Sequence, residues 1–372
     1  MWIDFLAILT LAAYQYHVTP YQMAIVSAAG LLPGILSATY IGKLCDRKNP
    51  KHLLLWSIML RLVATGSILF CHDFVLFVLL VGSRSVFTTV AGPAINVMAV
   101  QSLGPDERPK FYSILNVLNS TAKIMAPAIG TVSSSLTSEA VALIMSATFA
   151  AASLVTFAFV RLEPRPSPEA ASRGQTDVDI GAKVPSLRPL LWIAGTYAFS
   201  VFMVNNLVPL VLQQADLDKS LLGVLVSCSG AGNILSGLWL AKHSAANRLR
   251  GRISETVAPA LLQAAGFGLI GVVLWADTSN ISLVLPVMFF VIGMFSARFA
   301  IALNVYMTAH YAPAIGAVSG TLQAWQSGMI FVAPMIGAVI LDRLGGPALF
   351  WFAAIVVAVS FAVLWVATSR RS

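Results

Sequence analysis

The chain has 372 residues, of which 58% are apolar and only 10% are charged, with a formal net charge of +8. An ordinary soluble domain has roughly 45–50% apolar and about 25% charged residues, so this composition excludes a soluble globular protein. The 26 glycines and 18 prolines are spread through apolar runs, which excludes a collagen-like or low-complexity polymer. The apolar runs are therefore predicted to lie in lipid, as in an all-α polytopic membrane protein.

A membrane-spanning helix needs about 20 apolar residues, and the chain has room for roughly twelve. In chain order the runs cover residues 2–16, 22–42, 53–71, 74–101, 111–135, 139–160, 189–213, 220–241, 256–276, 280–308, 314–340 and 346–367. A proline-rich polar stretch divides them into six and six. The sequence thus predicts a six-helix bundle over 1–161, a cytoplasmic linker over 162–187 and a second six-helix bundle over 188–372.

The first run, residues 2–16, is shorter than the others. At 1.5 Å per residue it covers about 22 Å, against a hydrocarbon core of about 30 Å. We therefore expect a truncated first helix.

Basic residues predict the topology, because loops rich in Lys and Arg stay in the cytoplasm. Most of the 23 Lys and Arg residues fall on the side that holds both termini and the linker. We expect a protein of the inner (cytoplasmic) membrane with cytoplasmic N- and C-termini. The positive charge is then a topology signal that needs no nucleic-acid partner.

Signals for enzymatic chemistry are absent from the sequence. The three cysteines and five histidines are scattered, so neither a disulfide framework nor a metal site is predicted. No G-x-x-x-x-G-K-[ST] phosphate loop occurs, which argues against ATP as the energy source, and no repeated filter or charged ring suggests a channel. We expect a protein that is not an enzyme and holds no cofactor.

The loop after the second run carries a recognisable motif, from Gly42 to Lys51. Asp46, at a helix end, can accept hydrogen bonds from the N-terminal amides of a neighbouring helix, and Gly42 allows two helices to approach closely. The segment resembles the signature G-x-x-x-D-R-x-G-R-[RK] of the major facilitator superfamily, with Gly42, Asp46, Arg47 and Lys51 matching and Asn49 and Pro50 departing. The resemblance implies that this loop is a cytoplasmic latch; the alternative is a loop that is basic only to set topology.

Two further segments extend the resemblance. Arg84, followed by Gly92-Pro93-Ala94, is similar to an intramembrane arginine of the superfamily's fourth helix, and residues 126–130 resemble its antiporter element G-P-x-x-G-G. Pro127 and Gly130 are the retained positions of that helix-bend element. The branch most similar in these features contains drug/proton antiporters such as macrolide-efflux and enterobactin-export proteins. The resemblance implies twelve helices in two pseudo-symmetric bundles, alternating access and proton-coupled export.

Asp4 is the one acidic residue that falls inside a predicted span. Burial would raise the pKa of a carboxyl group there and a nearby arginine would lower it, and alternation between these two states is what proton coupling requires. We therefore expect Asp4 to couple transport to protons together with Arg84. The alternative is a structural ion pair, for which Arg61 is a candidate.

The remaining intramembrane polar residues suggest a substrate cavity. Charges in lipid are costly, so such cations are expected to face the protein interior. The predicted cavity residues are Arg61, Lys123, Arg298, Asn205, Asn206, Gln323, Gln326 and Trp325. Gln323 and Gln326 share a helix face, whereas only one of the adjacent Asn205 and Asn206 can face the cavity. Some of these residues could instead bond helix to helix.

The intramembrane cations outnumber the single carboxylate, which favours an anionic substrate. The sequence thus predicts a secondary transporter, a proton-coupled exporter of a small amphiphilic anion. An importer or a lipid flippase of the same fold is the alternative. Its partners would be the small-molecule substrate, protons and the lipid bilayer, and we expect a monomer.

Overall fold

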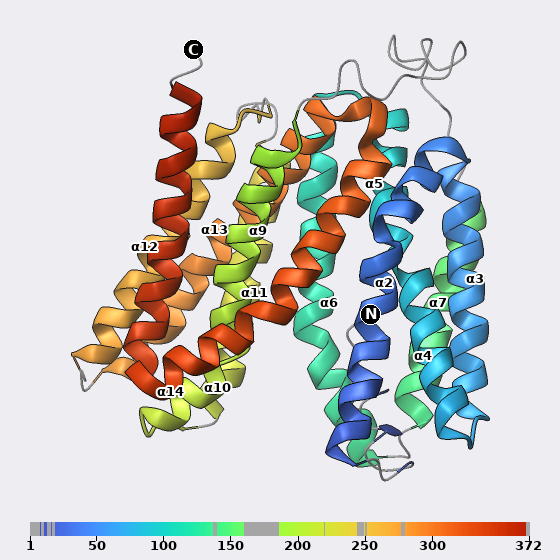
Figure 1. Cartoon of the computed structure of the whole chain (residues 1–372), viewed down its shortest axis with the longest axis horizontal. Helices are drawn as coiled ribbons and strands as arrows, with labels where there is room; N and C mark the ends of the chain where they lie inside the picture. The colour runs from blue at the N-terminus through green and yellow to red at the C-terminus, as the bar shows by residue number, and fades with distance from the viewer. Residues whose placement is uncertain are drawn as a thin grey trace. The chain divides into compact units, whose positions relative to one another are not determined.

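The computed structural model describes residues 8, 11, 12, 16, 19–136, 140–159, 186–218, 220–243, 249, 251–276 and 280–369, and every secondary-structure element in them is a helix (Figure 1). The helices are α2 (Pro20–Arg47), α3 (Pro50–Leu69), α4 (Phe74–Thr89), α5 (Ala91–Ser102), α6 (Arg108–Leu136), α7 (Ala140–Phe159), α9 (Arg188–Asn205), α10 (Val208–Gln214), α11 (Ser220–Lys242), α12 (Ser254–Trp275), α13 (Ile281–His310), the short 3₁₀ helix η2 (Ala312–Ala314) and α14 (Ile315–Ser369).

Local sequence explains where several helices begin. Thr19 and Gln22 form a capping box at the start of α2, in which Gln22 N donates to Thr19 Oγ1 at 3.3 Å. Asn49 caps α3, with Pro50 at the first helical position, where a missing N–H costs nothing. Asp73 caps α4 by accepting from Leu76 N at 2.8 Å.

Six helices in the described part of the chain are long and apolar enough to cross a membrane, or seven if the bent pair α9 and α10 is one span. The pair bends by 43°, which breaks the single span predicted over 189–213. The runs 314–340 and 346–367 both lie in α14, which consists of two helices that meet at a kink at Gly345, where φ is 81°. The count of twelve spans stays a prediction.

The predicted short first helix lies mostly outside the described residues. Ile8, Leu11 and Ala12 are described and buried, and they pack in one apolar cluster with residues of α2, α3 and α4. The Tyr16 hydroxyl donates to the Cys71 carbonyl at 2.6 Å, which fixes the chain just before α2.

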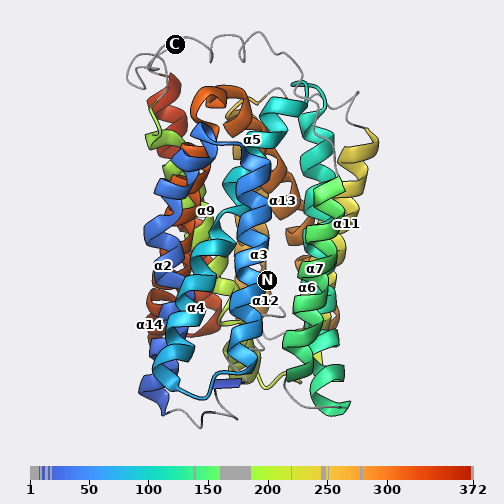
Figure 2. The same cartoon turned by 90° about the vertical axis from the view of Figure 1, so that its right-hand side faces the viewer.

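The chain forms two compact units. Unit 1 is drawn from the described residues of 1–104, 125–184 and 311–324, and α2, α3, α4 and α7 lie side by side in it (Figure 2). Unit 2 is drawn from those of 105–124, 185–310 and 325–372. Both α6 and α14 contribute to each unit. The predicted bundle boundaries, 1–161 and 188–372, are not tested by this division and stay a prediction.

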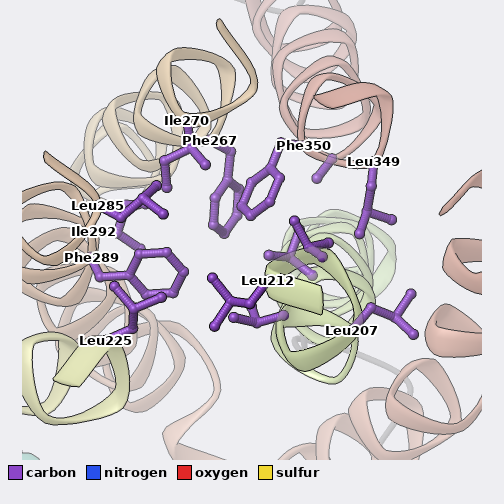
Figure 3. Packing of buried hydrophobic residues seen from close by; sticks show 14 of the residues in the cluster. Leu207, Leu212, Leu225, Phe267, Ile270, Leu285, Phe289, Ile292, Leu349 and Phe350 are labelled. Carbon is purple, nitrogen blue, oxygen red and sulfur yellow. The ribbon is translucent and has the colours of Figure 1, made fainter. Parts of the chain in front are cut away.

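The core of unit 2 is made almost entirely of aliphatic and phenylalanine side chains. Phe267 of α12 and Phe350 of α14 lie with their ring centroids 6.0 Å apart, and Phe289 of α13 and Leu212 of α10 close the cluster (Figure 3). Large apolar side chains are also exposed, for example Leu36, which is 82% exposed on α2. In water such exposure would be unfavourable, so these faces fit a lipid surrounding.

Candidate functional site

Asp46, which the sequence predicts to be part of a cytoplasmic latch, lies in the last turn of α2, in unit 1. Its two carboxylate oxygens accept hydrogen bonds from the backbone amides of Gly316 and Ala317, each at 2.7 Å. These amides stand in the first turn of α14, where N–H groups have no partner within the helix and the helix dipole favours a negative charge. The sequence placed Asp46 at a helix end; the structure identifies the helix whose amides it binds.

Glycines bring the two backbones together beside Asp46. A Cβ atom on Gly42 would overlap the carbonyl oxygen of Gly316, and one on Gly320 would overlap the carbonyl oxygen of Ala38. A side chain at Gly42 would therefore force α2 and α14 apart. The predicted close approach at Gly42 is present, and its partner is another glycine.

Two polar pairs that the sequence did not single out continue this contact. The Thr321 hydroxyl donates to Thr39 Oγ1 at 3.3 Å, and Asn96 Nδ2 on α5 donates to Ser319 Oγ at 2.7 Å. The sequence shows that these small polar residues lie within apolar runs. It does not show which of them bond to each other, because the partners are more than 200 residues apart. We call residues 311–324 with their contacts on α2 and α5 the latch seam.

The two departures from the signature have a local structural role. Asn49, in place of the second glycine, accepts from the amides of Lys51 and His52, and Pro50 begins α3. The Lys51 side chain donates to the Ala158 carbonyl at 3.2 Å, near the C-terminal end of α7, where a cation is favoured. Arg47 is exposed. The structure thus brings Gly42 and Asp46 to α14 and Lys51 to α7.

Arg84 is buried on α4, and its Nε donates to Thr65 Oγ1 on α3 at 3.1 Å. Thr65 in turn donates to the carbonyl of Arg61, a half-buried residue one turn earlier on α3. The structure therefore links Arg84 to the helix that carries Arg61. Asp4, predicted to couple transport to protons together with Arg84, lies outside the described residues.

Of the predicted cations in unit 2, Arg298 has the more defined environment. Its guanidinium carbon lies 4.9 Å from the centre of the Trp239 ring, a cation–π contact between α13 and α11. Lys123 is exposed on α6. Pro127 and Gly130 lie on the helical backbone of α6, and their side-chain surroundings are outside the described part of the chain.

The predicted asparagine pair lies at the end of a helix. Asn205 ends α9 and Asn206 caps it, both exposed, at the bend between α9 and α10. The prediction that only one of the two lines a cavity assumed a continuous helix through both residues. The bend removes that assumption, because the chain changes direction at these residues.

The three predicted residues of α14 have separate environments. The Trp325 indole donates to the Leu191 carbonyl at 2.9 Å and packs on Gly195, within unit 2. Gln323 belongs to unit 1, where its buried Oε1 has no hydrogen-bond partner among the described residues. Gln326 is half-buried in unit 2. Trp325 thus holds α14 to α9.

A buried polar cluster in unit 2 was not predicted as a unit. Tyr197 stacks on Phe299 with ring centroids 3.6 Å apart, and its hydroxyl donates to Gln263 Oε1 at 2.5 Å, with Ser296 Oγ 3.0 Å away. The cluster joins α9, α12 and α13. No group of three potential metal-binding side chains occurs in the described residues.

Comparison with known proteins agrees with this architecture. The family model of the Major Facilitator Superfamily matches residues 1–329. The chain belongs to the major facilitator superfamily. As a member of that superfamily, whose proteins are secondary transporters, it is an integral membrane protein.

Among curated proteins, an uncharacterized transporter of the superfamily, YfiS of Bacillus subtilis (strain 168), is 25% identical over 245 residues. The match covers 63% of this chain and 58% of that protein, so the chain spans little more than half the length of this relative.

Solved structures share the fold at low sequence identity. The human organic anion transporter MFSD10 is 19% identical with a TM-score of 0.70, over 98% of this chain and 89% of that chain. The transporter FucP in its outward conformation is 10% identical with a TM-score of 0.75, over 97% and 94%. A bacterial homologue of the iron transporter ferroportin, in an outward-facing state, is 14% identical with a TM-score of 0.64, over 97% and 93%.

The hydrogen bonds that Asp46 accepts from Gly316 and Ala317 are expected to hold the latch seam closed. Asp46→Asn removes the carboxylate charge beside the N-terminus of α14. That charge contributes about 1 kcal/mol to the stability of the closed latch seam, so we expect the seam to open several-fold more often in this variant. Cys45 is fully buried beside Asp46, so in a variant that keeps Cys45 as its only cysteine, labelling by N-ethylmaleimide reports this opening. Asp73→Asn, which alters a carboxylate cap on α4, is the matched control. Equal labelling rates in both variants would refute the latch role.

Proposed function

We propose that this secondary transporter is a proton-coupled exporter of small amphiphilic anions that works by alternating access. The observation that carries the proposal is the charge of its membrane helices. Arg84 is buried in unit 1 and Arg298 stacks on Trp239 in unit 2. The acidic residues placed by the structure lie near helix ends, in connections or, for Asp342, three residues before the kink at Gly345. A bound anion would stabilise cations that are costly to bury, and a bound cation would be repelled.

The latch seam supports the alternating-access part of the proposal. Its contacts are a pair of charge-assisted hydrogen bonds, two side-chain hydrogen bonds and glycine packing, which are short-range and can break together. A contact with a small net free energy suits a transporter whose two states are nearly balanced. We propose that the seam holds one state closed and separates in the other.

Export, rather than import, is favoured by Pro127 and Gly130, the retained positions of the antiporter element. Proline leaves a helix carbonyl without its partner and favours a bend. We place the exporter in the inner membrane with both termini in the cytoplasm, in the drug/proton antiporter branch. Import or lipid flipping by the same motion is the second candidate.

Efflux assays test the substrate class. Cells that express the protein are expected to gain less than about twofold resistance to ethidium, because a lipophilic cation would meet net positive charge in a low-dielectric site. Inside-out vesicles acidified inside are expected to take up radiolabelled hexanoate, a small amphiphilic anion, and Lys123→Ala or Arg298→Ala is expected to reduce that uptake. Strong ethidium efflux that survives both substitutions would overturn the anionic substrate.

A further inference from the structure

The geometry of unit 2 points to a specific carboxylate-binding site where α6, α11 and α13 meet. We propose that Arg298, Ser236 and Asn116 bind the carboxylate of an organic anion and that Trp239 packs on its apolar part. The proposal rests on the anionic substrate class proposed above and assigns that class to four side chains. Two of them, Ser236 and Trp239, lie outside the residues predicted as the cavity.

The position of Ser236 follows from the contacts of α11. Gly232 packs against the backbone of Phe290 and Met294 on α13, and Trp239 lies under Arg298 of the same helix. Residues 232, 236 and 239 are spaced four and three apart and share one helix face. Ser236 therefore faces α13 between these two contacts, and it is 1% exposed.

Asn116 reaches the same turn of α11 from α6. A Cβ atom on Gly237 would lie 3.7 Å from Asn116 Nδ2 and 2.6 Å from a methyl group of Val117. Gly237 follows Ser236 directly, so its glycine character lets α6 approach this turn closely. Arg298 from one side and Asn116 from the other thus converge on residues 236–239 of α11.

The polar atoms at this turn are buried and unsatisfied. Asn116 Nδ2, Ser236 Oγ and Arg298 Nε have no hydrogen-bond partner within the described part of the chain. A buried unsatisfied group costs about 1–3 kcal/mol, more if charged. Neighbouring residues avoid this cost: Asn233 Nδ2 donates to the Ser229 carbonyl at 3.0 Å, one turn earlier on α11.

The chemistry of these groups selects the ligand. Two N–H donors, a hydroxyl and a guanidinium charge match the oxygen atoms of a carboxylate, which accepts several hydrogen bonds at once. A cationic group would be repelled by the guanidinium of Arg298 and would offer no acceptor to these donors. Trp239 is 40% exposed, so part of the indole remains available to an apolar chain attached to the carboxylate. An inorganic anion would satisfy the donors without using that surface.

Binding can be measured on the full chain in nanodiscs of neutral phosphatidylcholine. The probes are hexanoate, hexyltrimethylammonium as the cation of matched chain length, and inorganic phosphate as an anion without an apolar part. We expect hexanoate to raise the Tm and to change the tryptophan fluorescence, with the fluorescence change lost in Trp239→Phe. Phosphate is expected to bind about tenfold more weakly, because it lacks the apolar contact.

Variants separate a binding role from a structural one. Arg298→Gln is expected to weaken hexanoate binding about tenfold and Ser236→Ala about threefold or more. Because Ser236→Ala removes an unsatisfied hydroxyl, the Tm without ligand is expected to stay constant or rise. Ser227→Ala, at an exposed position of the same helix, is the matched control and is expected to change neither quantity. A lower ligand-free Tm with an unchanged response to hexanoate would overturn the proposal.

The remaining outcomes distinguish this site from the proposed function. If wild type does not respond to hexanoate, or the variants bind it as wild type does, the site is wrong, and the vesicle uptake assay still decides the substrate class. If phosphate binds as tightly as hexanoate, the site takes a small inorganic anion and the proposal for an organic carboxylate fails. If hexyltrimethylammonium, and not hexanoate, raises the Tm, both the site and the anionic substrate class are overturned.

Discussion

Gly42→Ala is expected to produce one of the two largest effects on transport, a loss of at least about tenfold, because the variant cannot close the latch seam without moving a backbone. The added methyl group would overlap the carbonyl oxygen of Gly316 and crowd the Cα atom of Ala317. Neither is the end of a flexible side chain. To relieve the overlap, α2 and α14 must separate, which lengthens the hydrogen bonds of Asp46.

Gly66→Ala is the matched control for this substitution. Gly66 lies in α3 of the same unit, and no atom lies within 4 Å of a Cβ atom placed there. Alanine favours a helix over glycine by about 0.5–1 kcal/mol, so the Tm of this variant is expected to rise slightly. The measurements are N-ethylmaleimide labelling of Cys45 and vesicle uptake of hexanoate. Wild-type labelling and uptake in Gly42→Ala would show that the close approach is dispensable.

The second large effect is expected for Asp4→Asn, which we predict abolishes proton-driven accumulation and leaves passive exchange intact. A side-chain amide cannot release or take up a proton, so a carrier that depends on this carboxylate loses its coupling. The measurement compares hexanoate uptake driven by a pH gradient with hexanoate exchange at equal pH. Asp4 was singled out by the sequence and lies outside the described residues, so this experiment tests its role through transport alone.

Asp216→Asn is the control for charge removal. Asp216 is exposed and has a φ of 51°, a left-handed conformation that asparagine adopts as readily. We expect both kinds of uptake to remain at the wild-type level in this variant. Accumulation against a gradient at the wild-type rate in Asp4→Asn would move the coupling site to another group.

Much of the helical architecture can be predicted from the sequence. Apolar runs about 20 residues long indicate spanning helices, and polar residues at their ends set where helices begin, as Asn49 and Asp73 do. The segment from Gly42 to Lys51 resembles the signature of the superfamily, and the family match over residues 1–329 confirms that membership. Such features are local, since each depends on residues within a few positions along the chain.

The helix partners were decided only by tertiary structure. In a membrane helix the lipid-facing and protein-facing sides are both apolar, so hydrophobic periodicity does not tell which side packs on which neighbour. The sequence therefore did not pair Asn96 with Ser319, nor assign the Trp325 indole to the Leu191 carbonyl.

What the sequence by itself determined is thus the membrane class, most helix positions and Asp46 as a helix-end acceptor. The tertiary structure decided that α14 supplies the amides, that Asn205 and Asn206 stand at a bend, and that Ser236 is buried without a partner among the described residues. The physical reason is that a hydrogen bond or a close contact depends on distances between helices. Those distances arise when residues far apart in sequence pack together, and no local pattern encodes them.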